Sequence, residues 1–312
     1  MVNTKRIFLS LTTRCNIKCA KCWRFNVFGA GRDISKEVLD KFMKEFKNYE
    51  GTIIVGSGEN LISRYIEDYI KWCVDNNIKT TILTTGMMFD KFYNNDYFFK
   101  PNITWGVTFD GFSNKEIKNL QLGMDVEKVK RNLVSIRKRY PESSFYINIT
   151  HMKNNLYSTK DIIKFAHELG IYKVYITQLK LFEGLDDTYT KEQVNDFDSK
   201  EFKSVMKEVY DLSEKLGVKL YAPLSSKKMD CFNDDINNIS PSIHTNGNII
   251  FCYGRDGHVI GNILDKNGMQ VWRNLLNKLK NNKEEQKKWC NLCNAGATSE
   301  RGYYYIPGNQ KR

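Results

Sequence analysis

Residues 6–24 read RIFLSLTTRCNIKCAKCWR and combine a short apolar run with three closely spaced cysteines. The run at 6–11 predicts a β-strand, because its length and apolar content suit one. Cys15, Cys19 and Cys22 follow directly, and the ends of parallel strands are where α/β proteins hold ligands. A structural zinc site takes four protein ligands, and a cubane iron–sulfur cluster normally takes four thiolates. Three cysteines therefore predict a metal site with one open position.

A strand-then-helix alternation continues from this segment to about residue 220. Further strands are predicted at 52–56, 80–85, 103–109, 145–151 and 173–179. Helices are predicted at 35–46, 62–76, 125–139, 158–169 and 197–216. Such alternation is typical of a parallel sheet with helices outside it. Since a closed eight-unit barrel usually needs about 250 residues, we predict an α/β fold of the partial (β/α)6, TIM-like barrel type.

The pattern changes after about residue 224. Residues 241–254, PSIHTNGNIIFCYG, are typical of a hairpin with an Asn-Gly turn, and a helix is predicted near 267–281. These features predict a small α+β module that contains cysteines. We therefore predict two domains, a core at 1–223 and a second domain at 224–312.

Composition limits the function classes. Eight cysteines in a chain with no secretion signal favour metal sites over disulfides, although Cys73 shares an apolar helix face and is expected in the core. The formal net charge is +12, which we place mainly on solvated faces, with attraction of an acidic partner as the alternative. No nucleic-acid module and no run of about 18 apolar residues is present. We expect a cytoplasmic protein with no nucleic-acid or membrane partner.

The spacing C-x3-C-x2-C after the first strand of a partial barrel resembles the hallmark of the radical S-adenosylmethionine (radical SAM) superfamily. The resemblance implies that Cys15, Cys19 and Cys22 hold a 4Fe–4S cluster, whose fourth iron is chelated by the amino and carboxylate groups of S-adenosylmethionine (SAM). An electron from the cluster would cleave the sulfonium to give methionine and a 5′-deoxyadenosyl radical. That radical would then remove a hydrogen atom from the substrate.

The loop after the second strand, Ser57-Gly58-Glu59-Asn60, resembles a Gly-Gly-Glu-Pro segment of the family that contacts the methionine amino group. Glycine permits close backbone approach, and a carboxylate or carbonyl can accept from an ammonium. The resemblance makes Ser57, Gly58 and Glu59 candidates for cofactor binding, whereas Asn60 departs from the family pattern.

The segment VTFDG at 107–111 resembles the family's Ser-x-Asp-Gly after the fourth strand. Thr108 and Asp110 are therefore candidates for cofactor or substrate contacts, as are Thr85 and Asn148 from neighbouring strands. Two features depart from the family: Lys21 precedes the third cysteine, and residues 114–125 lack the arginine that related peptide-modifying members often carry.

Four further cysteines, Cys231, Cys252, Cys290 and Cys293, lie in the C-terminal region. Their spacing alone leaves zinc and an iron–sulfur cluster open. Their order around the hairpin, followed by IGNI at 260–263 and a C-x2-C, resembles the Twitch (short SPASM) extension of radical SAM enzymes. That resemblance implies one fully ligated auxiliary 4Fe–4S cluster.

The resemblance leaves the substrate open. A peptide-modifying oxidoreductase, or maturase, is the first hypothesis. The second is a small-molecule dehydrogenase or epimerase acting on a sugar, cyclitol or carbinol, and the third is a non-catalytic metal-stabilised binding protein. Either enzyme would need an electron donor such as flavodoxin or ferredoxin. Among the histidines, His151 is at a strand's C-terminal end, and a place facing the pocket is the alternative to a place in the core.

Overall fold

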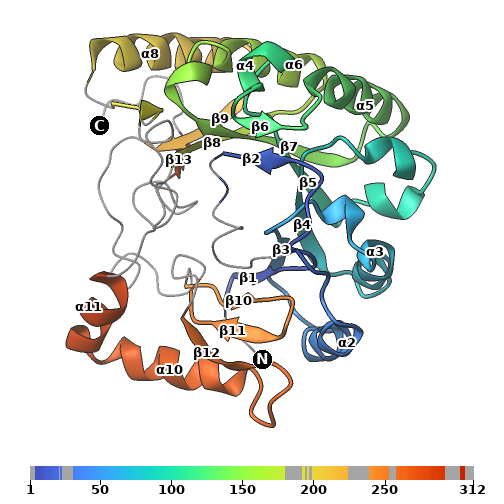
Figure 1. The fold of residues 1–312 in the computed structure, drawn as a ribbon, viewed down its shortest axis with the longest axis vertical. Coiled ribbons are helices and arrows are strands. Elements are labelled where there is room, and N and C mark those ends of the chain that lie inside the picture. The colour runs from blue at the N-terminus through green and yellow to red at the C-terminus, as the bar shows by residue number, and fades with distance from the viewer. Residues whose placement is uncertain are drawn as a thin grey trace. The chain divides into compact units, whose positions relative to one another are not determined.

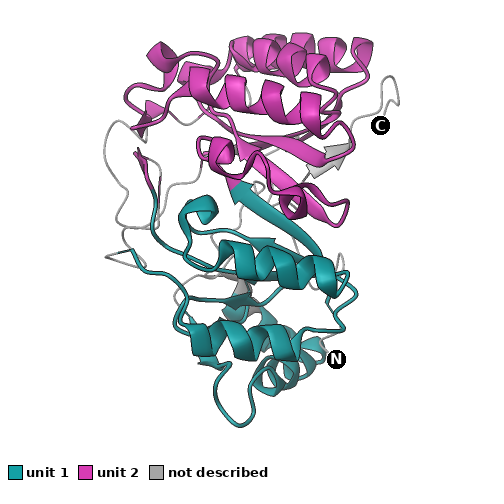
Figure 2. Ribbon diagram, turned by 90° about the vertical axis from the view of Figure 1, so that its right-hand side faces the viewer, with its two compact units in different colours: residues 1–15, 24–83, 228–296 teal, residues 16–23, 84–227, 297–312 magenta. Residues whose placement is uncertain are grey.

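The computed structural model describes residues 4–20, 22, 31–179, 192–193, 195–196, 199–223, 239–252, 258–291 and 303–305. The chain divides into two compact units, which are coloured separately in Figure 2. Unit 1 takes residues 1–15, 24–83 and 228–296, and unit 2 takes residues 16–23, 84–227 and 297–312. No helix among the described residues is long and apolar enough to cross a membrane.

The sheet of unit 1 is built around β1 (Arg6–Leu9), the strand predicted before the three cysteines. β1 pairs in parallel with β3 (Thr52–Val55), which pairs in parallel with β4 (Lys79–Thr84). Successive side chains of a strand point to opposite faces, so Ile7 and Leu9 share one face, and both are buried. The apolar run of the sequence therefore forms a core strand.

The predicted C-terminal hairpin extends this same sheet. β10 (Ser242–Ile243) pairs in parallel with β1 and antiparallel with β11 (Asn248–Ile250), which pairs antiparallel with β12 (Val259–Asn262). Gly247 in the hairpin turn has a φ of 83°, a left-handed conformation that costs glycine little because it lacks a Cβ. The Asn-Gly prediction of a hairpin is confirmed.

Helices of unit 1 begin and pack as their sequences predict. α2 (Lys36–Glu45) begins at its N-cap Ser35, whose hydroxyl accepts a hydrogen bond from the backbone N–H of Val38 at 3.2 Å. α3 (Ile66–Asp75) buries one apolar face that includes Cys73, and burial raises the pKa of the Cys73 thiol. This cysteine is therefore a core residue, as expected. The later helices are α10 (Gln270–Lys280) and α11 (Lys283–Asn291).

The sheet of unit 2 is parallel except at one edge. β5 (Ile103–Thr108), β7 (Ser144–His151), β8 (Lys173–Gln178) and β9 (Lys219–Pro223) pair in that order in parallel. β13 (Tyr303–Tyr305) pairs antiparallel with β9.

One face of the unit 2 sheet is covered by three helices, as Figure 1 shows. These helices are α5 (Val126–Arg139), α6 (Thr159–Glu168) and α8 (Lys200–Lys215). Every second residue of β7 is buried, beginning at Phe145, whereas Asn148 and its neighbours on the other face are half-buried. The sheet therefore presents a polar face opposite its helix layer.

A two-stranded ribbon in unit 2 was not predicted. β2 (Lys18–Cys19) pairs antiparallel with β6 (Gln121–Leu122), and the two strands lie side by side in Figure 1. The single-turn helix α4 (Asn114–Ile117) precedes β6. Short 3-10 helices complete the described elements: η1 (Asn60–Ile62), η2 (Phe89–Phe92), η3 (Asp96–Phe99) and η4 (Lys153–Asn155).

The predicted strands and helices before residue 220 are all present, with ends that differ by a few residues. Residues 224–238 lie outside the described part of the chain, so the boundary between domains 1–223 and 224–312 stays a prediction.

Candidate functional site

The loop after β3 lies directly against the backbone that leads to Cys15. A Cβ placed on Gly58 would lie 2.4 Å from the carbonyl oxygen of Arg14 and 2.6 Å from that of Thr12. The backbone N–H of Glu59 also donates to the Arg14 carbonyl at 2.9 Å. Only glycine allows this approach, so Gly58 fixes the position of the chain just before the first motif cysteine.

Ser57 and Glu59 shape the same loop. Ser57 has a φ of 83°, which is unusual for a residue with a Cβ, and its hydroxyl lies 2.8 Å from that of Ser10 at the end of β1. The Glu59 side chain is buried and accepts a hydrogen bond from the backbone N–H of Leu61 at 3.1 Å, which caps η1. The described contacts of Glu59 are therefore those of a residue that sets the shape of the loop.

Asn60 stands where the family pattern has proline, and the structure explains its presence. Its Nδ2 donates to the carbonyl of Leu83 at 2.8 Å and to that of Val55 at 3.4 Å. It thus ties the end of β3 to the end of β4. The Asn60 Oδ1 is buried without a hydrogen-bond partner among the described residues.

The segment before Cys15 is held from a second direction. Arg14 forms an ion pair with Asp33 at 2.7 Å, and the backbone N–H of Thr13 donates to the carbonyl of Arg32 at 2.8 Å. The Cys15 side chain is half-buried.

Cys19 and Cys22 belong to unit 2, where the β2–β6 ribbon positions them. Cys19 lies opposite Gln121 in the ribbon, and the backbone N–H of Ala20 donates to the carbonyl of Leu120 at 2.9 Å. The backbone N–H of Cys22 donates to the carbonyl of Cys19 at 3.1 Å. Both cysteines are half-buried, and backbone contacts help to hold the second half of the motif.

Asp110 is the centre of a buried hydrogen-bond network. Its Oδ1 accepts from the backbone N–H of Thr150 at 2.6 Å, and its Oδ2 accepts from Gln121 Nε2 at 2.8 Å. Asn155 Nδ2 donates to the Asp110 carbonyl at 2.9 Å. Asp110 is only 1% exposed. This carboxylate therefore joins the ends of β5 and β7 to the strand that pairs with Cys19.

Gln121 is the site residue that the sequence analysis missed. It is 2% exposed, and its Oε1 is buried with no hydrogen-bond partner in the described part of the chain. Because a carboxylate oxygen accepts, the amide nitrogen must face Asp110, which leaves the amide oxygen to accept from another group. The available signal was that Gln121 falls in the segment 114–125, where related members carry an arginine.

Thr108 and Asn148 lie in one row across the polar face of the unit 2 sheet. Thr108 is paired with Asn148, Asn148 with Tyr175, and Tyr175 with Tyr221. The Tyr175 and Tyr221 rings are stacked with centroids 4.5 Å apart, and Tyr146 contacts Tyr175 at 4.9 Å. The two candidates for cofactor contacts therefore lie in the same row of the sheet as Tyr175 and Tyr221.

Thr85 follows β4 and opens a turn. It is 7% exposed, and its hydroxyl accepts from the backbone N–H of Met87 at 3.4 Å. Gly86 beside it has a φ of 80°. The described contacts of Thr85 are thus local to this turn.

His151 points to the helix side of the sheet and not to the polar face. It is fully buried, its Nε2 lies 3.3 Å from the Thr159 hydroxyl, and its ring contacts Phe202. Burial lowers the pKa of His151 to about 4. The imidazole is therefore a neutral core group, and the alternative that it faces the pocket is wrong.

The C-terminal cysteines are only partly described. Cys252 is a half-buried free thiol after β11, whereas Cys231, Cys293 and the side chain of Cys290 lie outside the described residues. The ring of Phe251 contacts that of Trp289 with centroids 5.2 Å apart, and Trp272 Nε1 donates to the Phe251 carbonyl at 2.7 Å. The residues that immediately precede Cys252 and Cys290 are therefore in contact.

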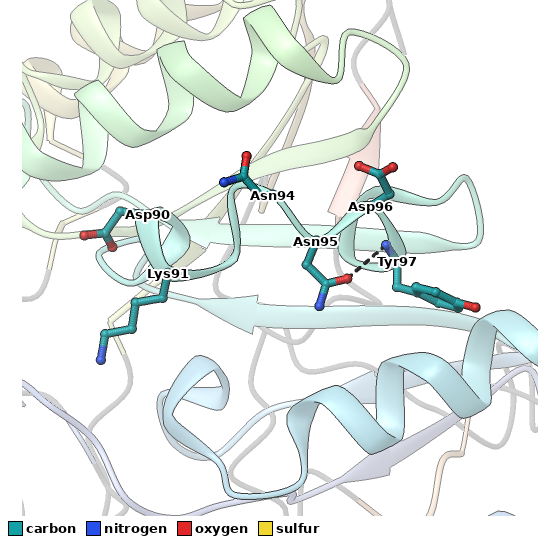
Figure 3. Close-up of a pocket in the computed structure, with 6 residues that line it drawn as sticks. All are labelled: Asp90, Lys91, Asn94, Asn95, Asp96 and Tyr97. Carbon is teal, nitrogen blue, oxygen red and sulfur yellow. Dashed lines mark hydrogen bonds between the residues drawn. The ribbon is translucent and has the colours of Figure 1, made fainter.

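Among the described residues, no three His, Cys, Asp or Glu side chains are grouped as ligands of one metal ion. In a 4Fe–4S cubane each thiolate binds a different iron atom, so the cysteines do not surround a single ion. The finding therefore concerns sites for one metal ion and not sites for a cluster. An open hollow of about 560 Å³, drawn in Figure 3, is lined by Asp90, Lys91, Asn94, Asn95, Asp96 and Tyr97. None of the candidate residues lines this hollow, and Asn95 Oδ1 is occupied by the backbone N–H of Tyr97 at 3.2 Å.

Comparison with known families decides what the cysteine motif represents. Residues 9–177, more than half of the chain, match the radical SAM superfamily. The chain belongs to the radical SAM superfamily. It is therefore an enzyme that uses SAM together with a 4Fe–4S cluster.

Solved structures confirm the predicted fold class. SuiB of Streptococcus suis, bound to SAM, is 15% identical, with a TM-score of 0.69 over 94% of this chain and 72% of that chain. A structure of anSMEcpe with AdoMet and the Cp18Cys peptide is 17% identical, with a TM-score of 0.63 over 93% of this chain and 88% of that chain.

A curated relative comes from Pyrococcus furiosus. It is the tungsten-containing aldehyde ferredoxin oxidoreductase cofactor-modifying protein, which is 21% identical over 300 residues, covering 86% of this chain and 80% of the relative.

Proposed function

We propose that this radical SAM enzyme removes a hydrogen atom from a peptide and acts as an oxidoreductase that matures a ribosomally made peptide. The observation that carries this proposal is the likeness to SuiB, which has also been solved bound to the precursor peptide SuiA, with a TM-score of 0.67. The anSMEcpe structure likewise holds a peptide.

We assign the 4Fe–4S cluster to Cys15, Cys19 and Cys22. Thiolates are the usual protein ligands of such clusters, and all three cysteines are half-buried. When bound, the cluster and SAM supply the electron and the 5′-deoxyadenosyl radical that takes the hydrogen atom from the substrate. Cys15, Cys19 and Cys22 would ligate three of the irons, which would leave the fourth iron for SAM.

The remaining candidates fall into two roles. Gly58, with Ser57 and Glu59 shaping its loop, exposes main-chain groups to which an ammonium can donate. Asp110 acts as a positioning residue, since its described hydrogen bonds go to protein groups. The polar contacts that we assign to SAM or substrate come from Thr85, Thr108, Gln121 and Asn148.

We also propose that Cys231, Cys252, Cys290 and Cys293 hold an auxiliary 4Fe–4S cluster. The contact of Phe251 with Trp289 supports this, because it brings together the backbone positions before two of these cysteines. About eight iron atoms per chain are expected for two cubanes. A content of about four iron atoms and one zinc atom per chain would instead indicate a zinc site in place of the auxiliary cluster.

Cleavage of SAM tests the assigned cluster. The anaerobically reconstituted protein with SAM and dithionite should release 5′-deoxyadenosine, measured by liquid chromatography. Cys22→Ala should abolish the product, whereas Cys73→Ala should keep it, because Cys73 is a core residue of α3. Wild-type protein that carries its iron but forms no 5′-deoxyadenosine would contradict the proposal.

A small-molecule substrate is the second candidate, favoured by the relative from Pyrococcus furiosus, whose name describes a cofactor-modifying protein. Short peptides encoded beside the gene, incubated with the enzyme and SAM, should show a mass change under the first proposal. If no such peptide changes mass while a small cofactor or sugar-type compound does, the second candidate replaces it.

We further propose a cytoplasmic location and an electron donor of the flavodoxin or ferredoxin class. Reduced thiols for two clusters favour a reducing compartment. The donor is needed because each cleavage of SAM consumes one electron.

A further inference from the structure

Leu122 is an exposed apolar side chain beside the cysteine loop. It is 65% exposed, the most exposed of the large hydrophobic residues in the described part of the chain. In the β2–β6 ribbon it is paired with Lys18, and the next pair along the ribbon is Cys19 with Gln121. An exposed leucine therefore lies one residue along the ribbon from a proposed cluster ligand.

Four exposed lysines accompany Leu122: Lys18, Lys115, Lys118 and Lys153. Lys115 belongs to α4, and Lys118 follows it. Lys153 begins η4, whose Asn154 donates from Nδ2 to the Glu116 carbonyl at 3.5 Å. The segment 112–123 carries one acidic residue, Glu116, and its Oε2 accepts from the backbone N–H of Phe112 at 2.6 Å.

Some lysines on the helices of the same unit form ion pairs, whereas others, such as Lys200 and Lys215 on α8, form none within the described residues. Lys160 pairs with Glu208, Lys164 with Asp161, and Lys207 with Asp211. No ion pair is found within the described residues for the four lysines beside Leu122. The charge of these four lysines is therefore available to a partner, and what sets them apart from Lys200 and Lys215 is that they accompany an exposed leucine.

We propose that this patch, formed by Lys18, Lys115, Lys118, Leu122 and Lys153, docks a small one-electron carrier protein with acidic residues around its redox centre. An apolar centre inside a charged rim is the usual anatomy of a protein interface, and opposite charge speeds and orients docking. In the complex, the carrier loses one electron and the cluster gains it, with no bond made or broken. The proposal rests on the proposed function, because Cys19 must ligate that cluster.

Binding of oxidised flavodoxin, titrated by fluorescence or calorimetry at low and moderate salt, tests this patch without turnover. We expect the affinity to fall with added salt. The double variant Lys115→Glu with Lys118→Glu should bind at least about tenfold more weakly, and Leu122→Ser about fivefold more weakly. The matched control, Lys200→Glu with Lys215→Glu on α8, should stay within about twofold of wild type. Ferredoxin is titrated in the same way as a second probe.

Turnover then separates this proposal from the proposed function. With dithionite as reductant, the Leu122 and lysine variants should form 5′-deoxyadenosine at the wild-type rate, and with reduced flavodoxin they should slow. Absence of product from wild type with dithionite would overturn the proposed function. The docking surface would be overturned if neither carrier bound to the wild type. It would also be overturned if the variant at Lys115 and Lys118 formed product with dithionite and bound flavodoxin with wild-type affinity. Circular dichroism of the variants confirms that they fold.

Discussion

The two strand-end loops that carry most candidate residues are held by opposite means. In unit 1, the loop after β3 depends on a missing side chain, since Gly58 allows the backbone to lie against the Arg14 and Thr12 carbonyls. In unit 2, the loop after β5 depends on a particular side chain, since the Asp110 carboxylate joins Thr150 and Gln121. A backbone-held loop and a side-chain-held loop should respond differently to substitution, and four experiments test that difference.

Removal of the Asp110 carboxylate should have the largest effect. Asp110→Ala leaves the part-buried N–H of Thr150 and the buried amide of Gln121 without these partners, and a buried orphan group costs about 1–3 kcal/mol. We expect the free energy of unfolding to fall by about 3 kcal/mol, measured by urea denaturation. Asp110→Asn should lose less, because the Gln121 amide can rotate to accept from the new Nδ2. Equal losses for both variants would contradict the network.

A single methyl group at Gly58 should come next. Gly58→Ala places a Cβ against two backbone carbonyls that cannot rotate away, and overpacking of this kind costs about 1–3 kcal/mol. We also expect SAM affinity to fall at least about tenfold, measured by equilibrium dialysis. Gly56→Ala is the matched control, because its Cβ would meet only the Leu83 side chain at 3.5 Å. Wild-type behaviour of Gly58→Ala would show that the loop is not held by its backbone.

Lowering the pH should reduce the free energy of unfolding, because His151 of unit 2 is buried in its neutral form. The pKa of His151 is lowered to about 4 in the folded protein from an unfolded value of 6.5. Since the unfolded chain then binds more protons, stability is present above pH 6.5 and is lost as the pH falls toward 4. Between pH 8 and pH 5 the loss from this residue is about 2 kcal/mol.

Urea denaturation across that pH range measures the effect. His151→Phe should remove this part of the pH dependence, whereas His167→Phe, at an exposed position on α6, should retain it. An unchanged pH slope in His151→Phe would contradict the buried, neutral imidazole.

The smallest effect is expected at Asn60. Asn60→Ala removes the hydrogen bonds to the Leu83 and Val55 carbonyls, at a net cost of about 1 kcal/mol. Asn60→Asp should cost more than Asn60→Ala, because a carboxylate would face two carbonyl oxygens. Thermal unfolding of the two variants gives the order, and a more stable Asn60→Asp would rule out the donor role.

The difference between the loops also explains what the sequence could reveal. Gly58 follows a strand at a position where glycine has a physical reason to occur, and the pattern Ser-Gly-Glu became informative through its resemblance to the family segment after the second strand. The strands and helices were predictable for the same reason, because each depends on the period of its own apolar residues.

The hydrogen-bond network of Asp110 could not be predicted from the sequence. Thr150 and Gln121 lie 40 and 11 residues away from Asp110 in the chain, and the β2–β6 ribbon that brings Gln121 to Cys19 has strands of two residues each. Such short strands carry no periodic signal. His151 was ambiguous because a strand-end residue can point to either face, and only the register of β7 decides which one.

The pairing of β10 with β1 has a consequence for biosynthesis. Phe8 lies opposite Ser242, so the edge of the first strand stays open until more than two hundred further residues have been translated. At about 5–20 residues per second, this interval lasts about 10–50 s. During that time the segment leading to Cys15 is attached to an incomplete sheet. We therefore expect the segment that leads to Cys15 to reach its final position only after residues 239–243 have emerged, so that a cluster inserted into a finished site would be inserted late.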